Sequence, residues 1–469
     1  MLRVGFATAC ITPPVGMEIP GLFERRVAVG VHDDLFVRAC VVDDEHTCAA
    51  FVQTDAIKVP RPLVDAGRER AHALCGIAPE HCFIAATHTH SGGPVFAGFM
   101  SQADAGYIDW VAAQVASAIA EAHRRRRPTL AGASSGTAAG VAFNRRFIMK
   151  DGTQRTHPGK LNPDIVRPAG PEDPTVTVVG FRDPNSIEPF GCVVHFACHA
   201  THMNGILYSA DYPRWIVETL QRVYGPRFGV VFLNGSCGDV TQADNRSARP
   251  WEFGVYWCRR TGQTVGAAAL RALALMDYPT TATVDVRSER LRASIRASTT
   301  ETQQAARDYL ATHDLSATDA ESIYANELLE VEKIRAKTPE VALEVQGMRV
   351  GDAFFWGVPG EFFQEPALRV RDAAKFRHTC CVELANGYYG YICAKDAYAA
   401  GGYEPRLARS SILAEDTADR VASLATGLAD EMYSRAEAEI ASLPKNIAWI
   451  TEESSALDGI NEMDQDVPD

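Results

Sequence analysis

Five of the thirteen histidines lie in two short clusters. The first cluster, His88 and His90, directly follows an apolar run, and the second contains His195, His199 and His202. Imidazole nitrogens are common zinc ligands, so two clusters in a chain with few other histidines predict a metal site. The alternative is that each cluster consists of hydrogen-bonded core or loop histidines that hold no ligand.

Neither histidine spacing identifies a metal-binding motif by itself. His195 and His199 are spaced like the two ligands of an H-E-x-x-H zinc helix, but the glutamate of that motif is absent. The preceding residues 191–194 are typical of a strand, so we interpret this spacing as accidental. His88 and His90 would share one face of a strand only if the backbone stays extended between them.

Carboxylate and phenol side chains that could complete a zinc site occur later in the chain. Glu361 follows the strongly apolar run 353–358 and is expected where a sheet edge meets a cleft. Three tyrosines fall within 388–391, and Tyr403 follows in a glycine-rich turn. Catalytic zinc uses three or four such ligands and keeps a position for water. The alternative for the tyrosines is aromatic packing beneath a loop.

Asp211 and Asp239 are candidate outer carboxylates. Metal-bound histidines commonly donate their second ring N–H to a carboxylate, which fixes the orientation of the ring. We expect these two aspartates to hold ligating histidines in this way. The alternative role for both is to cap a helix or a turn.

Two other enzyme classes are not supported by the motifs. The segment 234–239 resembles the nucleophile elbow of serine hydrolases, but Asn234 stands where that motif needs a glycine before Ser236. No glycine pattern for a dinucleotide or a nucleotide phosphate lies between a predicted strand and a predicted helix.

Strands and helices alternate over the first part of the chain. This pattern predicts an α/β protein with a largely parallel or mixed layered sheet. The segment 144–174, rich in Pro, Gly, Lys and Asp, is predicted to be a long loop that forms a wall of the site. The predicted strands are 35–42, 48–54, 82–87, 175–182, 192–198 and 229–233, and the predicted helices are 64–74, 107–123 and 216–223.

The rest of the chain predicts a second α/β part. Its strands are 281–295 and 345–358, its surface helices lie within 299–337, and its last helix is 415–440. We therefore divide the chain into three parts: a catalytic core over 1–280 that holds the histidines, a second part over 281–450 that completes the site with Glu361, Tyr391 and Tyr403, and an acidic tail over 451–469.

The composition of the chain limits the classes of partner and the cellular location that we expect. The formal net charge of −13 disfavours a nucleic acid, because phosphate binding needs a concentrated basic surface. No run reaches the ~18 apolar residues of a membrane helix, and the start of the chain lacks the apolar core of a signal peptide. We expect a cytoplasmic protein without stable membrane insertion, whose twelve cysteines are reduced and mostly buried. A small-molecule substrate is the expected partner, and a homo-oligomer is left open.

Taken in order, the motifs resemble the neutral (non-lysosomal) ceramidase family. The resemblance depends on their order and spacing, since each motif alone is weak. The matching motifs are I-T-P-P-V-G at 11–16, T-H-T-H-S-G at 87–92, F-N-R at 143–145, C-H-A-T-H-M-N at 198–204, S-A-D at 209–211, G-D-V at 238–240, V-P-G-E-F at 358–362, L-A-N at 384–386, Y-I at 391–392 and G-Y-E at 402–404.

The resemblance implies a layered α/β fold with mixed sheets flanked by helices. It also implies a zinc-dependent hydrolase that cleaves an amide (N-acyl) bond with a metal-activated water. The residues that match the zinc ligands of the family are His88, His199, Glu361 and Tyr391. The residues that match those contacting substrate carbonyl or hydroxyl groups and assisting the chemistry are His90, Arg145 and Tyr403.

The chain departs from the family pattern in several places. Ala200 replaces a proline after His199, and Val95-Phe96 replaces two glycines after the first histidine motif. Members of the family are also usually longer, secreted or membrane-associated, and carry a C-terminal immunoglobulin-like domain. We therefore expect a shorter, cytosolic member that acts on a small soluble amide rather than on ceramide.

Other functions are compatible with the same site. An ester or lactone hydrolase, or a lyase acting on a polyhydroxy metabolite, could use the same zinc ligands, because function depends on the site walls more than on the fold. A non-catalytic binding protein with this fold is a second alternative. Candidates at all four implied ligand positions, together with Tyr403, favour an enzyme.

Overall fold

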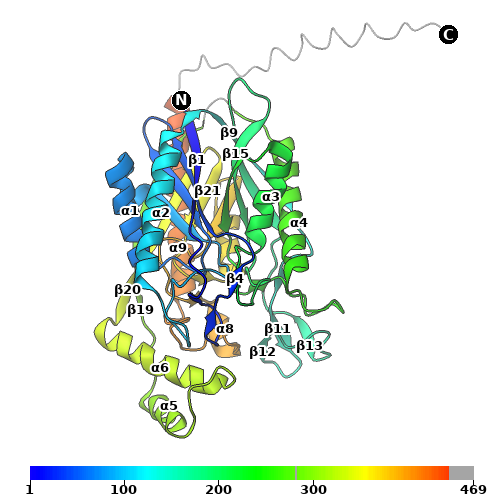
Figure 1. Cartoon of the computed structure of the whole chain (residues 1–469), viewed down its shortest axis with the longest axis vertical. Helices are drawn as coiled ribbons and strands as arrows, with labels where there is room; N and C mark the ends of the chain where they lie inside the picture. The colour runs from blue at the N-terminus through cyan, green and yellow to red at the C-terminus, as the bar shows by residue number, and fades with distance from the viewer. Residues whose placement is uncertain (280–281, 443–469) are drawn as a thin grey trace, which may run out of the picture.

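Three β-sheets pack against one another at the centre of the molecule (Figure 1). The computed structural model describes residues 1–279 and 282–442, and the predicted acidic tail lies outside these residues. The first sheet has the order β7 (Cys82–Ala86), β6 (Cys48–Thr54), β5 (Phe36–Asp43), β1 (Arg3–Cys10), β8 (Arg127–Pro128). The second has the order β17 (Gly229–Asn234), β15 (Pro189–Phe196), β14 (Thr175–Arg182), β9 (Leu130–Thr137). The third has the order β19 (Val284–Ser294), β20 (Glu340–Val350), β21 (Ala353–Gly357), β23 (His378–Val382).

Each of the three sheets contains one parallel pair of strands. These pairs are β6–β7, β15–β17 and β21–β23, and the other neighbours within the three sheets are antiparallel. The sheets are therefore mixed, which confirms the fold class expected from the alternating pattern.

One hydrophobic core is shared by the three sheets. Phe51, Phe83, Phe181 and Phe355 are almost completely buried in it. The rings of Phe51 and Phe355 meet edge to face with centroids 5.1 Å apart, which joins the first sheet to the third. Strands buried on both faces have nearly continuous apolar sequences, and this explains the unbroken run Ala49–Val52 in β6.

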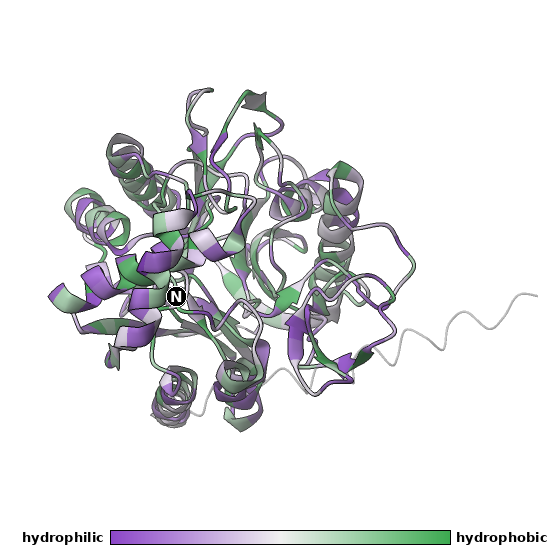
Figure 2. Ribbon diagram, turned by 90° about the horizontal axis from the view of Figure 1, so that it is seen from below, coloured by the Kyte–Doolittle hydropathy of each residue, from purple (hydrophilic) through white to green (hydrophobic). Residues whose placement is uncertain are grey.

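Helices cover the outer faces of the three sheets (Figure 2). The first sheet is covered by α1 (Arg61–Cys75) and α2 (Ala105–Arg124), the second by α3 (Tyr212–Tyr224) and α4 (Val255–Ala274), and the third by α7 (Gln364–Ala373) and α9 (Thr417–Ser442). Helix α2 approaches β1 so closely that a Cβ at Gly5 would lie 2.1 Å from the carbonyl oxygen of Ala122. A separate helical pair, α5 (Thr300–Thr312) and α6 (Ala320–Lys337), projects beyond the sheets.

Two predicted elements are wrong. The predicted loop 144–174 contains a three-stranded sheet in the order β12 (Gln154–Thr156), β11 (Arg146–Met149), β13 (Ile165–Pro168). The predicted single strand 345–358 is the antiparallel pair β20–β21, because the chain turns at Gly351, whose φ of 58° favours glycine. The division of the chain near residue 280 stays a prediction.

Two expectations from composition concern the cysteines and the membrane. All twelve cysteines are free, and nine of them are buried. Over the described residues, no helix combines the length and apolar character required to cross a bilayer.

Candidate metal centre

Four strand ends bring the implied ligands together. His88 lies two residues beyond β7, and His199 lies three residues beyond β15. Glu361 and Tyr391 are opposite each other in the short parallel pair β22 (Glu361–Phe362) and β24 (Tyr391–Ile392). Side chains from both halves of the chain thus meet at one edge of the sheets. His88 and His199 follow the carboxyl ends of strands in parallel pairs, a place where ligands are commonly held.

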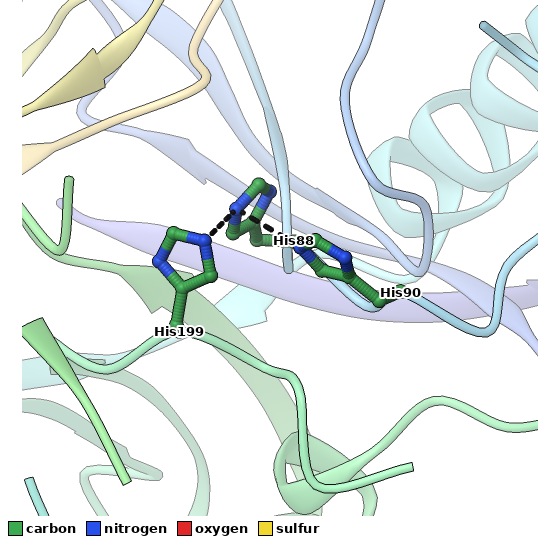
Figure 3. A group of neighbouring side chains, drawn as sticks. All are labelled: His88, His90 and His199. Atoms are coloured by element: carbon green, nitrogen blue, oxygen red, sulfur yellow. Dashed lines mark hydrogen bonds between the residues drawn. The ribbon is translucent and has the colours of Figure 1, made fainter. Parts of the chain in front are cut away.

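The backbone at His88 is not extended. Its φ is 68°, in the left-handed region that residues other than glycine rarely adopt. The His88 N–H donates to the carbonyl of Ala56, which helps to hold this conformation. The condition under which His88 and His90 would share a strand face is therefore not met, and the turn at His88 instead brings both rings toward His199 (Figure 3).

The three imidazoles are oriented by backbone carbonyls. In each ring, Nδ1 lies within 3.0 Å of a carbonyl oxygen, which can only accept a hydrogen bond. Nδ1 therefore carries the proton in the neutral rings, and Nε2 keeps its lone pair. The carbonyls belong to Ile57 for His88, to Gly21 for His90 and to Cys237 for His199.

The Nε2 atoms and one carboxylate oxygen converge on a single point. The Nε2 atoms of His88 and His199 are 2.9 Å apart, and those of His88 and His90 are 3.4 Å apart. Glu361 Oε2 lies 3.4 Å from His88 Nε2 and 3.6 Å from His199 Nε2, and it has no hydrogen-bond partner. A cation bound between them would satisfy both the facing lone pairs and the unpartnered buried carboxylate oxygen. These N and O donors fit zinc.

The pKa values of the residues around this point are shifted by their burial and by one another's charges. Burial disfavours a charged His88, but Glu361 outweighs this effect and raises the pKa of His88. Burial acts against the Glu361 carboxylate, yet His88, with Tyr391 and Arg145, lowers the Glu361 pKa to about 2. Burial lowers the pKa of His90 and of His199, so both rings are neutral. His90, His199 and Glu361 are thus in the protonation states that bind zinc, whereas a protonated His88 would have to lose its proton.

Arg145 and Tyr391 lie beside the three histidines and Glu361. Arg145 Nη2 donates to the carbonyl of Gly238 at 2.6 Å and to the Tyr391 hydroxyl at 3.1 Å. Arg145 Nε lies 3.1 Å from a carboxylate oxygen of the fully buried Glu404. Burial disfavours the Arg145 charge, but the neighbouring phenols and carboxylates outweigh it and raise the pKa of the guanidinium. Arg145 is thus a fixed positive charge.

Tyr403 occupies the open side of the site. Its ring meets that of Tyr391 edge to face, with centroids 6.0 Å apart, and its side chain is 39% exposed. Burial of the hydroxyl raises the pKa of Tyr403, so the phenol keeps its proton and can donate it in a hydrogen bond.

All seven predicted site residues line one cavity of about 580 Å³. Its polar lining includes the three histidines, Arg145 and Glu361. Its walls are mainly apolar, and they include Leu22, Phe23, Ile57, Phe96, Phe99 and Phe253.

Three neighbours of the site were not identified from the sequence. The Tyr388 hydroxyl donates to Glu361 Oε1 at 2.8 Å, and the Glu404 carboxylate accepts from Arg146 and forms an ion pair with Arg145. Lys58 also lines the cavity. Tyr388 stands in the tyrosine cluster and Glu404 in the G-Y-E motif at 402–404, so a signal existed for both, whereas Lys58 belongs to no motif.

The outer-carboxylate hypothesis is wrong for both aspartates. Asp211 caps α3 and lies 2.8 Å from His202, a buried histidine outside the cavity. Asp239 accepts from Asn144 and from the backbone N–H of Gln364, and it contacts no histidine. His195 binds the carbonyl of Cys381 and does not line the cavity, in agreement with the accidental spacing.

Comparisons with known proteins identify the fold. A scan against protein-family models and a search of curated protein sequences found no match. Among solved structures, the chain is similar to a ceramidase complexed with C2 and to the neutral ceramidase from Pseudomonas aeruginosa. In both cases the sequence identity is 20%, the TM-score is 0.71, and the match covers 92% of this chain and 75% of the solved chain. The chain therefore has the neutral ceramidase fold.

Proposed function

We propose that this protein is a zinc-dependent hydrolase that cleaves an amide (N-acyl) bond in a small molecule. The observation that carries the proposal is the unpartnered Glu361 Oε2 facing the Nε2 atoms of His88 and His199. These three residues would hold the metal, with Tyr391 as the fourth candidate. When bound, zinc would polarise the substrate carbonyl and provide a water nucleophile at neutral pH.

The remaining residues of the site would act on the substrate, by stabilising charge and by transferring a proton. Arg145 is permanently charged, and Tyr403 keeps its proton, so both can stabilise the carbonyl oxygen as negative charge develops on it. His90 presents the lone pair of Nε2 because its Nδ1 proton is donated to Gly21. It can therefore take a proton from water and pass it to the departing nitrogen.

The overall reaction adds one water across the C–N bond. The water oxygen joins the acyl carbon, and one proton goes to the nitrogen, which leaves as an amine. The products are a carboxylic acid and an amine. The apolar walls of the cavity suit the hydrocarbon of the acyl group, and a volume of about 580 Å³ suits a small-molecule substrate.

The zinc-loaded protein is expected to hydrolyse short-chain N-acyl amides in preference to ceramide in micelles. The difference in kcat/KM should be at least about tenfold, because a site that fits a small ligand gains little from a long lipid. The assay is release of the fatty acid or amine, with the corresponding esters and lactones as parallel substrates. A preference for ceramide would contradict the proposed small-molecule substrate. A preference for esters or lactones would contradict the proposed amide hydrolysis.

Zinc affinity is expected to fall as the pH is lowered. Glu361 raises the pKa of His88, so in acid the metal must displace a proton from this ring. The dissociation constant should rise about tenfold per pH unit below the His88 pKa and stay constant above it, if one proton is displaced. Competition with a chelating dye over a pH series measures this slope. A constant affinity through the acidic range would show that His88 is not a ligand.

A further inference from the structure

A buried lysine stands beside the candidate metal centre. Lys58 lies between β6 and α1, next to Ile57, whose carbonyl orients His88. Only 7% of the Lys58 side chain is exposed, and it lines the same cavity as the histidines. A lysine so deeply buried is rare unless it is paired.

The amine of Lys58 is held between two aromatic rings. Nζ lies 3.2 Å from the centroid of the Phe96 ring and 3.6 Å from that of Tyr388. These contacts stabilise a cation but accept none of its three N–H groups in a conventional hydrogen bond. Among the described residues, Lys58 forms no hydrogen bond and no ion pair. Its N–H donors are thus available to a molecule in the cavity.

The other charged groups of the cavity already have partners. Arg145 pairs with Glu404, and Arg406 pairs with Glu321. Glu361, the single carboxylate among the residues that line the cavity, belongs to the metal centre. Lys58 is therefore the basic side chain of the cavity without a counter-ion.

Nearby carboxylates do not provide that counter-ion. Glu327 is engaged by Arg409 through both carboxylate oxygens. Burial lowers the pKa of Lys58 well below its usual value, and Glu361 opposes this effect only in part. An anion brought against Nζ would relieve the cost of burying this amine.

We propose that Lys58 binds a carboxylate of the substrate, so that the substrates are amides with an acidic group, of the N-acyl amino acid class. This inference rests on the proposed function. In such a molecule the acyl chain would lie against the apolar walls, the scissile amide at the metal centre and the carboxylate at Lys58. A charge-assisted hydrogen bond of this kind selects the acid over a neutral analogue of the same shape.

The test compares N-octanoylglycine with N-octanoylglycinamide, which has the same shape without the negative charge. The zinc-loaded protein should prefer the acid. Lys58→Met should lower the ratio of the two kcat/KM values by roughly 10- to 100-fold, as expected for a hydrogen bond to a charged group. The loss should appear mainly in the KM of the acid. Lys58→Arg should restore part of the preference, and Lys58→Gln is a second neutral variant if Lys58→Met folds poorly.

Arg406→Met is the matched control, because it removes a second cavity cation that is already paired with Glu321. It should change the ratio much less than Lys58→Met does. An equal change would mean that the general positive potential, and not Lys58, selects the acid. A preference for the acid that survives Lys58→Met would show that another group binds the carboxylate and would overturn the inference.

Binding measurements separate failure of this inference from failure of the proposed function. If neither these two amides nor the other short-chain N-acyl amides are hydrolysed, the proposed function is wrong. Dissociation constants from calorimetry then give the same acid-to-amide ratio without turnover. Lys58→Met must lower that binding ratio, and an unchanged ratio would overturn the assignment of Lys58.

Discussion

His199→Ala is expected to abolish zinc binding and to lower kcat/KM by at least about 10³-fold, since the metal contributes several kcal/mol to the transition state. The variant loses the Nε2 atom that lies 2.9 Å from His88 Nε2 and 3.6 Å from Glu361. Glu361→Gln should act similarly, because it removes the carboxylate charge and keeps an oxygen or nitrogen for the hydrogen bond with Tyr388. Metal content by elemental analysis and steady-state kinetics measure both effects.

His195→Asn is the control for this prediction. His195 lies four positions earlier in the same segment, but it binds the carbonyl of Cys381 and does not line the cavity. The variant should retain about one zinc per chain. Full turnover by a metal-free preparation of the wild-type protein would contradict the zinc hypothesis directly.

Tyr391→Phe and Tyr403→Phe are expected to differ in their effect on zinc binding. Tyr391 is buried between Arg145 and Glu361, so loss of its hydroxyl should weaken zinc binding as well as turnover. Tyr403 lies on the open side of the site, so its variant should retain zinc. If Tyr403 donates to the developing oxyanion, kcat should fall by about 10²–10³-fold, close to 3–4 kcal/mol.

Zinc content and kcat, measured together on both variants, distinguish these roles. Loss of zinc from Tyr403→Phe with retention in Tyr391→Phe would mean that the two assignments are exchanged. Wild-type turnover in both would leave the tyrosines as packing residues, which is the alternative that the sequence left open.

Much of the fold could be predicted from hydrophobic patterning. Strands such as β6 and β17 and helices such as α2 were placed within a few residues, because long apolar runs and amphipathic periods reflect burial directly. The small sheet β11–β13 was not predicted. Its strands have three or four residues, and polar side chains such as Arg155 and Arg167 give them no apolar alternation.

The candidate site, like the fold, could be predicted only in part. His88, His199 and Glu361 stand in recognisable motifs at strand ends, and the structure brings them together. The orienting groups could not be predicted, because backbone carbonyls hold the three rings and carry no sequence signature. Lys58 could not be predicted either, since its importance depends on two rings distant in sequence. The roles of His90 and Arg145 stay predictions.

The pairing of β22 with β24 has a consequence for how the protein is made. His88 leaves the ribosome about 300 positions before Tyr391, which at roughly 5–20 residues per second is about 15–60 s of synthesis. During that interval the nascent chain carries the histidines without Glu361 and Tyr391, which meet only in this strand pair. Under the proposed function, the complete set of metal ligands therefore exists only after translation of nearly the whole described chain. Any product that stops before β24 would expose histidines that compete for metal without forming the finished centre.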